Sequence, residues 1–190
     1  MKKQRPSFYP LIFFLTLFSL PVFSATPPYF FLDGEGGWAR INDTQTKLSR
    51  EHNTGGAYNI NAGYAFRRFF AMEMGYYGLP NNTFHQGIKG THNEAAALDI
   101  KVIIPYDNGF NIIGKAGVAA SRYALTPSYV PTMGYIEDAG DYVKAVMLLG
   151  LGFSYSFTKH LDAVIQGTGL SHNGVIPAKI MVTTGLTYNF

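Results

Sequence analysis

Residues 70–77 read FAMEMGYY, and their side chains alternate in character. Phe70, Met72, Met74 and Tyr76 occupy every second position, and Glu73 lies between two of them. Successive side chains of a β-strand point to opposite faces, so this segment would have one apolar face and one face that carries a carboxylate. A carboxylate is costly in hydrocarbon, so we expect the apolar face to meet lipid and Glu73 to point inward.

The same spacing recurs in seven further segments of the chain. High aromatic and glycine contents favour strands, because these residues are poor helix formers. The segments also lack the 3.6-residue period of an amphipathic helix. The expected strands are 29–40, 56–66, 69–79, 93–105, 110–121, 142–157, 161–171 and 178–190. Short connections alternate with long ones, which is typical of an outer-membrane barrel. We therefore predict an all-β fold, an eight-stranded antiparallel up-and-down transmembrane β-barrel with both termini in the periplasm.

The segment 142–157 strengthens the case for a membrane barrel over a soluble sandwich. Its expected outward positions include Met147, Leu149, Leu151 and Phe153, and Lys144 falls on the inward face. A soluble sandwich would crowd its polar face with lysine, glutamate and threonine. Here the polar faces are mostly glycine, alanine, serine and asparagine, which suits the narrow interior of an eight-stranded barrel.

Aromatic residues gather where the expected strands end. Several lie beside the short turns, and Trp38, Tyr76 and Tyr123 lie toward the long connections. Aromatic belts of this kind mark the two membrane interfaces of outer-membrane barrels. We therefore expect two outward girdles, one near each end of the strands.

The N-terminus has the pattern of an export signal. Lys2, Lys3 and Arg5 precede an apolar run at 11–23, and Ser24 and Ala25 follow it. Cleavage is expected after Ser24 or after Ala25, which divides the chain into a signal peptide at 1–25 and a barrel domain at 26–190. The alternative is a helical anchor, but the apolar run is shorter than the roughly 20 residues that a spanning helix needs.

Composition excludes several classes of site. The chain has no cysteine, so it has no disulfide, thiolate metal site or lipidated cysteine. Without the three basic residues of the signal, 12 basic residues balance 12 acidic ones, which gives nucleic-acid binding no electrostatic support. The histidines lack the spacing of a zinc site. We expect no metal, no cofactor and no catalytic residue.

The chain resembles the transmembrane domain of the OmpA family over nearly all of its mature length. The residues that carry the resemblance are Gly36-Gly37-Trp38, Gly63-Tyr64, the segment 70–76 and Lys115-Ala116-Gly117. The end of the chain, with Tyr188 and Phe190 outward, resembles the signal by which the barrel-assembly machinery recognises its clients. The resemblance implies a lumen network of paired charges at Glu73, Lys101 and Lys115. Glu35 stands where the family has a lysine, and Val164 where it has an arginine that can pair with the inward glutamate.

Alternation places eight charged residues inside the predicted barrel. They are Asp33, Glu35, Glu73, Asp99, Lys101, Lys115, Lys144 and Lys179, four acidic and four basic. A buried charge costs several kcal/mol unless it is paired, so this balance predicts a salt-bridged plug. The plug is interpreted as a polar structural core, and the alternative is a narrow ion path.

These patterns predict a non-enzymatic, monomeric outer-membrane barrel. It would contact lipid and lipopolysaccharide and display loops that bind host or phage ligands. One alternative is a porin-like ion channel. The other is a lipid A-modifying enzyme that uses Ser171 and His172, but adjacent strand residues point to opposite faces and would not be preset to pair.

Overall fold

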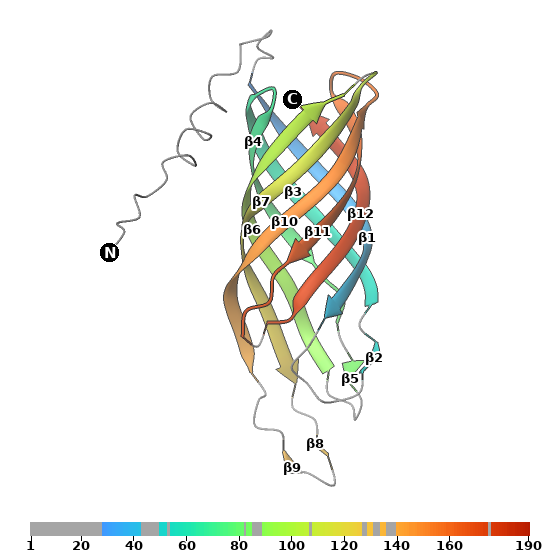
Figure 1. Cartoon of the computed structure of the whole chain (residues 1–190). Helices are drawn as coiled ribbons and strands as arrows, with labels where there is room; N and C mark the ends of the chain where they lie inside the picture. The colour runs from blue at the N-terminus through green and yellow to red at the C-terminus, as the bar shows by residue number, and fades with distance from the viewer. Residues whose placement is uncertain are drawn as a thin grey trace, which may run out of the picture.

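A computed structural model of the chain describes residues 28–42, 50–52, 54–81, 83–84, 89–106, 108–126, 129–130, 134–135, 140–174 and 176–190. The expected signal peptide lies outside these residues. The described residues form a tilted barrel of long antiparallel strands (Figure 1). None of their helices is long and apolar enough to cross a membrane.

Eight long strands make the wall, and four short ones lie in the long connections. The wall strands are β1 (Tyr29–Asn42), β3 (Thr54–Arg67), β4 (Phe70–Gly78), β6 (Lys89–Pro105), β7 (Phe110–Thr126), β10 (Asp141–Ser156), β11 (Leu161–Leu170) and β12 (Ala178–Asn189). The short strands are β2 (Arg50–His52), β5 (Thr83–Phe84), β8 (Tyr129–Val130) and β9 (Gly134–Tyr135).

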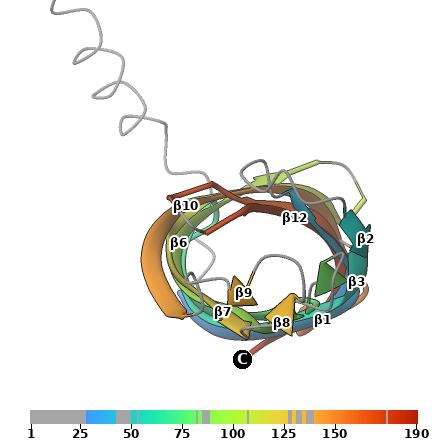
Figure 2. The same cartoon turned by 90° about the horizontal axis from the view of Figure 1, so that it is seen from below.

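The wall closes on itself in an up-and-down order. The neighbours run β6, β4, β3, β1, β12, β11, β10, β7, and β7 pairs back onto β6. The first and last strands meet in antiparallel register, with Glu35 opposite Gly185. Seen along its axis, the wall is a continuous ring (Figure 2). The predicted fold, a closed eight-stranded antiparallel barrel, is confirmed.

The connections differ at the two ends of the barrel. The three hairpins β3–β4, β6–β7 and β10–β11 turn within a few residues, and Tyr29 and Phe190 lie at this same end (Figure 1). We call it the short-turn end. Asn108 and Gly109 both have positive φ, 55° and 86°, in the β6–β7 turn. Asparagine followed by glycine tolerates this geometry best, which explains why the chain reverses there.

The strands extend further toward the long connections than their alternation predicts. β6 begins at Lys89 and β7 ends at Thr126, and these two residues are paired. The prediction placed these boundaries at Asn93 and Ser121. The difference has a physical reason, because backbone pairing continues past the apolar band, where side chains no longer need to alternate.

Glycines allow the close approach of β1 and β12 where the ring closes. A Cβ atom on Gly185 would lie 2.0 Å from the carbonyl oxygen of Gly34, and one on Gly37 would lie 2.0 Å from that of Val182. A Cβ atom on Gly34, which faces outward, would meet no other atom within 4 Å. The seam therefore requires glycine on its inward side and tolerates larger residues outside.

We predict that Gly185→Ala lowers the free energy of unfolding in urea by about 1–3 kcal/mol, because the added methyl group pushes β1 and β12 apart. Gly34→Ala is the matched control and should leave the urea midpoint almost unchanged. The measurement is urea unfolding followed by the gel mobility of unheated samples. Equal midpoints for the two variants would contradict this account of the seam.

Candidate functional site

The buried charges of the lumen meet at Glu73 of β4. Lys115 Nζ of β7 donates a hydrogen bond to Glu73 Oε1 at 2.5 Å, and Lys101 Nζ of β6 donates one to Oε2 at 3.1 Å. Lys101 Nζ also lies 3.8 Å from Asp33 Oδ2 of β1, and 4.6 Å from the centre of the Phe31 ring. The side chains of the four charged residues are at most 5% exposed. The cluster around one carboxylate thus joins four strands across the barrel.

Glu35 makes a second cluster without a cation. Gln166 Nε2 of β11 donates to Glu35 Oε1 at 2.5 Å, and the Thr183 hydroxyl of β12 donates to Oε2. Val164, which stands where the family has an arginine, is buried two residues before Gln166. Glu35 is therefore held by neutral donors. Gln166 and Thr183 were missed by the charge-based prediction, although alternation places both on inward faces.

Two other acidic side chains differ from the expectation of a fully paired plug. Asp99 lies opposite Glu73 in the β4–β6 register and is 2% exposed. Both carboxylate oxygens of Asp99 and both of Asp33 accept no hydrogen bond from the described residues. Asn59 and Asn61 of β3 are buried beside β1 and also make no side-chain hydrogen bond there. The middle of the lumen therefore holds more buried carboxylates than buried cations, whereas a balanced plug would hold equal numbers.

Lys144 and Lys179 do not join the network. Lys144 is exposed near the long-connection end of β10, so the prediction that it belongs to the lumen is wrong. Its position shares the inward parity but lies beyond the buried part of the wall. Lys179 is buried and donates to Ser121 Oγ at 2.8 Å, and its Nζ lies 5.9 Å from the centre of the Tyr123 ring. No ion pair of Lys179 occurs within the described part of the chain.

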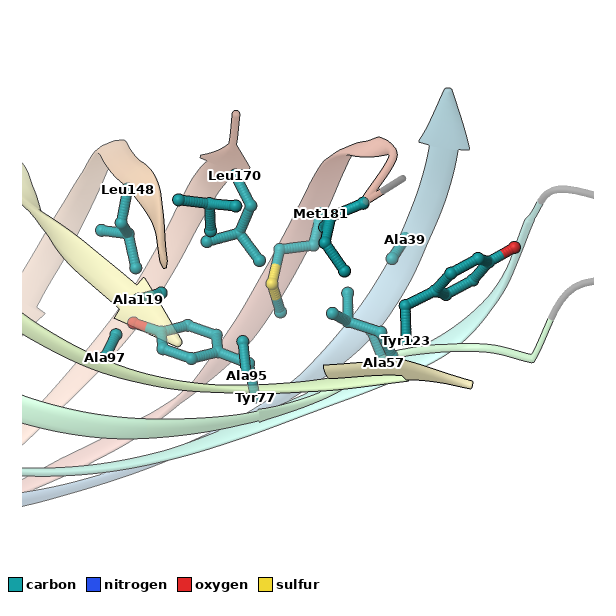
Figure 3. Packing of buried hydrophobic residues seen from close by; sticks show 13 residues of the cluster. Ala39, Ala57, Tyr77, Ala95, Ala97, Ala119, Tyr123, Leu148, Leu170 and Met181 are labelled. Atoms are coloured by element: carbon teal, nitrogen blue, oxygen red, sulfur yellow. The ribbon is translucent and has the colours of Figure 1, made fainter. Parts of the chain in front are cut away.

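An apolar cluster fills the lumen toward the long connections. Every wall strand contributes to it (Figure 3). Its members are Ala39, Ala57, Tyr77, Leu79, Ala95, Ala97, Ala119, Tyr123, Val146, Leu148, Leu170, Ile176 and Met181. Tyr123 belongs here and is 2% exposed, so its expected place in an outward aromatic girdle is wrong. Its parity with Ser121 explains the inward direction.

The outer wall carries the opposite pattern. Met72, Met74, Met147, Leu149, Leu151 and Phe153 are all at least half exposed, and Phe70 is partly covered by the stacked ring of Phe66. Pairs of exposed aromatic rings gather near the short-turn end, among them Phe30 with Tyr64 and Phe110 with Tyr155. An aromatic girdle of this kind is typical of the membrane interface.

An exterior ion-pair cluster limits the apolar band at the other end. Arg122 of β7 donates to Asp141 Oδ2 at 2.6 Å and to Glu94 Oε1 at 3.1 Å, and the Tyr76 hydroxyl donates to Glu94. The outward residues of β7 between Ile112 and Arg122 carry no charge. Ten strand residues rise by about 3.4 Å each. Along a strand tilted by about 40° from the barrel axis, they span about 25 Å of the axis, which is the height of the apolar band of outer-membrane barrels.

The described residues offer little to the enzymatic alternative. Ser171 Oγ accepts a hydrogen bond from the backbone N–H of Met147 at 2.9 Å, and His172 is exposed. The Ser171 hydroxyl is thus oriented toward the backbone of β10. The side chains that the structure describes also include no group of three or more histidine, cysteine or acidic residues placed to hold a metal ion.

Comparison with known proteins identifies relatives for this arrangement. The profile of the OmpA-like transmembrane domain matches residues 29–190. No curated protein matches by sequence. Solved structures of other proteins have similar folds, and the following three are among them. The attachment invasion locus protein Ail of Yersinia pestis, in complex with the heparin analogue sucrose octasulfate, has a TM-score of 0.60 at 11% identity, covering 87% of this chain and 100% of Ail.

The N-terminal β-barrel domain of Pseudomonas aeruginosa OprF has a TM-score of 0.59 at 14% identity, over 88% of this chain and 100% of that domain. The outer-membrane protease OmpT of Escherichia coli has a TM-score of 0.50 at 12% identity, over 89% of this chain and 99% of OmpT. At these identities the likeness extends to the fold alone. The fold is shared by a protease, so it does not by itself exclude an enzyme.

We predict that Glu73→Gln destabilises the barrel by about 3–5 kcal/mol, because it leaves Lys101 and Lys115 buried without their shared carboxylate. Adding Lys115→Gln should recover part of the loss by removing one unpaired charge. The measurement is the free energy of unfolding in urea.

The matched control is Glu94→Gln in the exterior cluster, where water screens the charge and the effect on unfolding should be much smaller. A Glu73→Gln barrel as stable as the Glu94→Gln barrel would show that the lumen network does not stabilise the fold.

Proposed function

The chain belongs to the OmpA-like transmembrane domain family, and on that premise we propose that it is a non-enzymatic outer-membrane barrel whose long connections bind partners outside the cell. The observation that carries the proposal is the asymmetry of the two ends. The three tight hairpins lie at the same end of the barrel as Tyr29 and Phe190, and the long connections lie at the opposite end. Loops on a rigid scaffold are where binding residues concentrate.

We infer the orientation from the same asymmetry. Outer-membrane barrels have short turns on the periplasmic side and longer loops outside, so the short-turn end and both termini would face the periplasm. This agrees with export by a signal peptide at 1–25 that is removed before assembly. The exposed residues of the outer wall would contact lipid and lipopolysaccharide. Tyr188 and Phe190 would serve as the recognition signal for the barrel-assembly machinery.

The chemistry of the long connections favours partners that are not strong polyanions. Residues 43–53, 79–88, 127–140 and 171–177 together hold two basic residues, Lys47 and Arg50. They hold four acidic residues, Asp43, Glu51, Glu137 and Asp138. Ail was crystallised with a heparin analogue. The small excess of acidic residues here favours a protein ligand on a host cell or a phage over a sulfated polysaccharide.

An ion channel is the second candidate, and the interior favours it less. The apolar cluster that includes Tyr77, Tyr123 and Leu148 fills the lumen on the long-connection side of the Glu73 network. Ions crossing that layer would lose their hydration without gaining polar partners. The excess of buried carboxylates on the short-turn side of the cluster is the feature that would make any residual path selective for cations.

We predict that the two ends of the barrel differ in their accessibility to a reagent outside the cell. Single introduced cysteines can report this, because the chain has none of its own. His172→Cys, in the β11–β12 connection, should react with a membrane-impermeant maleimide on intact cells. Lys159→Cys, in the β10–β11 turn, should react only after the outer membrane is permeabilised. The reverse pattern would show that the termini face outward.

We also predict that bacteria expressing the chain adhere to a cultured epithelial monolayer or adsorb phage better than bacteria without it. Replacing 128–138 by a short Gly-Ser linker should abolish the gain without changing heat-dependent gel mobility, because loop exchange leaves the wall intact. Adhesion that survives replacement of each of the four long connections in turn would contradict a loop-borne function.

A further inference from the structure

A cavity with both polar and apolar walls lies inside the barrel at the short-turn end. Its volume is about 440 Å³, within the range of small-molecule sites. Hydroxyl and amide side chains line one part of its wall, including Asn111, Ser154, Ser156, Thr187 and Asn189, and apolar side chains such as Ile103 and Ile113 line another. We call it the vestibule. An eight-stranded barrel has room for its own side chains or for one small ligand, and the vestibule is the place where this barrel leaves such room.

The inner end of the vestibule is closed. Lys101 lines it, but this lysine is held by Glu73 and lies over the Phe31 ring. The apolar cluster lies on the far side of Glu73, toward the long connections. A solute would therefore enter from the short-turn end and stop there, which makes the vestibule a pocket instead of a passage.

The wall of the vestibule carries a carboxylate oxygen that is not satisfied. Asp162 of β11 accepts a hydrogen bond on Oδ2 from Asn189 Nδ2 at 3.0 Å. Its other oxygen, Oδ1, is buried and accepts no hydrogen bond among the described residues. The aromatic ring of Tyr29 lines the same cavity. A buried carboxylate oxygen beside an aromatic ring is a suitable site for an ammonium group.

A cation stands across the opening from Asp162. The ring order places the β3–β4 turn and the β10–β11 turn on opposite sides of the barrel, with β1 and β12 on one path between them and β6 and β7 on the other. Arg68 of the β3–β4 turn lines the vestibule, and its guanidinium lies 5.9 Å from the centre of the Phe69 ring. None of the ion pairs within the described residues involves Arg68.

We propose that the vestibule binds a small zwitterion of the short-peptide class, with its ammonium group on the Asp162 carboxylate and its carboxylate on Arg68. A tripeptide extends about 10 Å between its charged ends, at about 3.3 Å per residue, which suits two groups on opposite walls. The hydroxyl and amide side chains between them can pair with peptide N–H and C=O groups. Lys159 of the β10–β11 turn also lines the vestibule, so an inorganic anion is the competing ligand, although Asp162 would repel it.

The test titrates triglycine into the folded full-length chain in lipid nanodiscs. Nuclear magnetic resonance of the backbone amides then follows residues 154–162 and 187–190. The shifts should saturate. N-acetylation of triglycine, or Asp162→Asn in the protein, should weaken binding at least tenfold. C-terminal amidation, or Arg68→Gln, should do the same at the other end.

The decisive measurement is whether the effects of the peptide modification and of the substitution on the binding affinity are additive. Acetylated triglycine should bind the wild-type chain and the Asp162→Asn chain equally, because each change removes the same ion pair. Arg67→Gln is the matched control, since Arg67 is the neighbouring arginine and does not line the vestibule, and it should leave the affinity unchanged. Asparagine at 162 can still accept from Asn189, and heat-dependent gel mobility checks that each variant is folded.

Three results would overturn the proposal. The first is the absence of saturable shifts with triglycine. The second is equal affinity for the free and the acetylated peptide, which would mean that Asp162 makes no contact with the ammonium group. The third is displacement of triglycine by an equal concentration of inorganic phosphate, which would make the vestibule an anion site. None of these results depends on the orientation of the barrel or on the function of its loops.

Discussion

The closing of β1 onto β12 is the constraint on which the rest of the structure depends. Hydrocarbon offers no partner to a backbone N–H or C=O group, so a sheet can cross a membrane only if it has no open edge. Here the first and last strands satisfy each other from Phe31 opposite Asn189 to Asn42 opposite Ala178. Inward-facing glycines of both strands allow that approach. Because closure fixes which face is inside, every side chain in the wall has only two possible environments.

Those two environments explain the inverted distribution of polarity. Most of the methionines, leucines and aromatic residues that would form the core of a soluble protein lie outside, and the charged residues around Glu73 lie inside. The interior is not uniform along the axis. Toward the long connections it is filled by the cluster around Tyr77, Tyr123 and Leu148, and in the middle by the network around Glu73. Toward the short turns it is hollow, with both polar and apolar walls.

This division separates the possible activities of the barrel in space. In the proposed function, binding outside the membrane falls to the long connections, and the filled layer isolates them from the vestibule. The Glu73 network contributes rigidity between the two, because a single carboxylate holds lysines from two strands and lies opposite Asp99 of β6. A ligand at either end would thus act on its own surface, with no open path between the ends.

The class of fold, the eight wall strands and the face on which most side chains lie follow from local sequence patterns. A period of two is a local property, so FAMEMGYY alone places Glu73 on the face opposite to Met72 and Met74. Only the tertiary structure decided which inward residues meet, because partners such as Glu73 and Lys115 come from strands far apart in the chain. Depth along the axis was also hidden. Alternation gave Lys144 a parity but no height, and height depends on strand tilt and register, which closure of the ring sets.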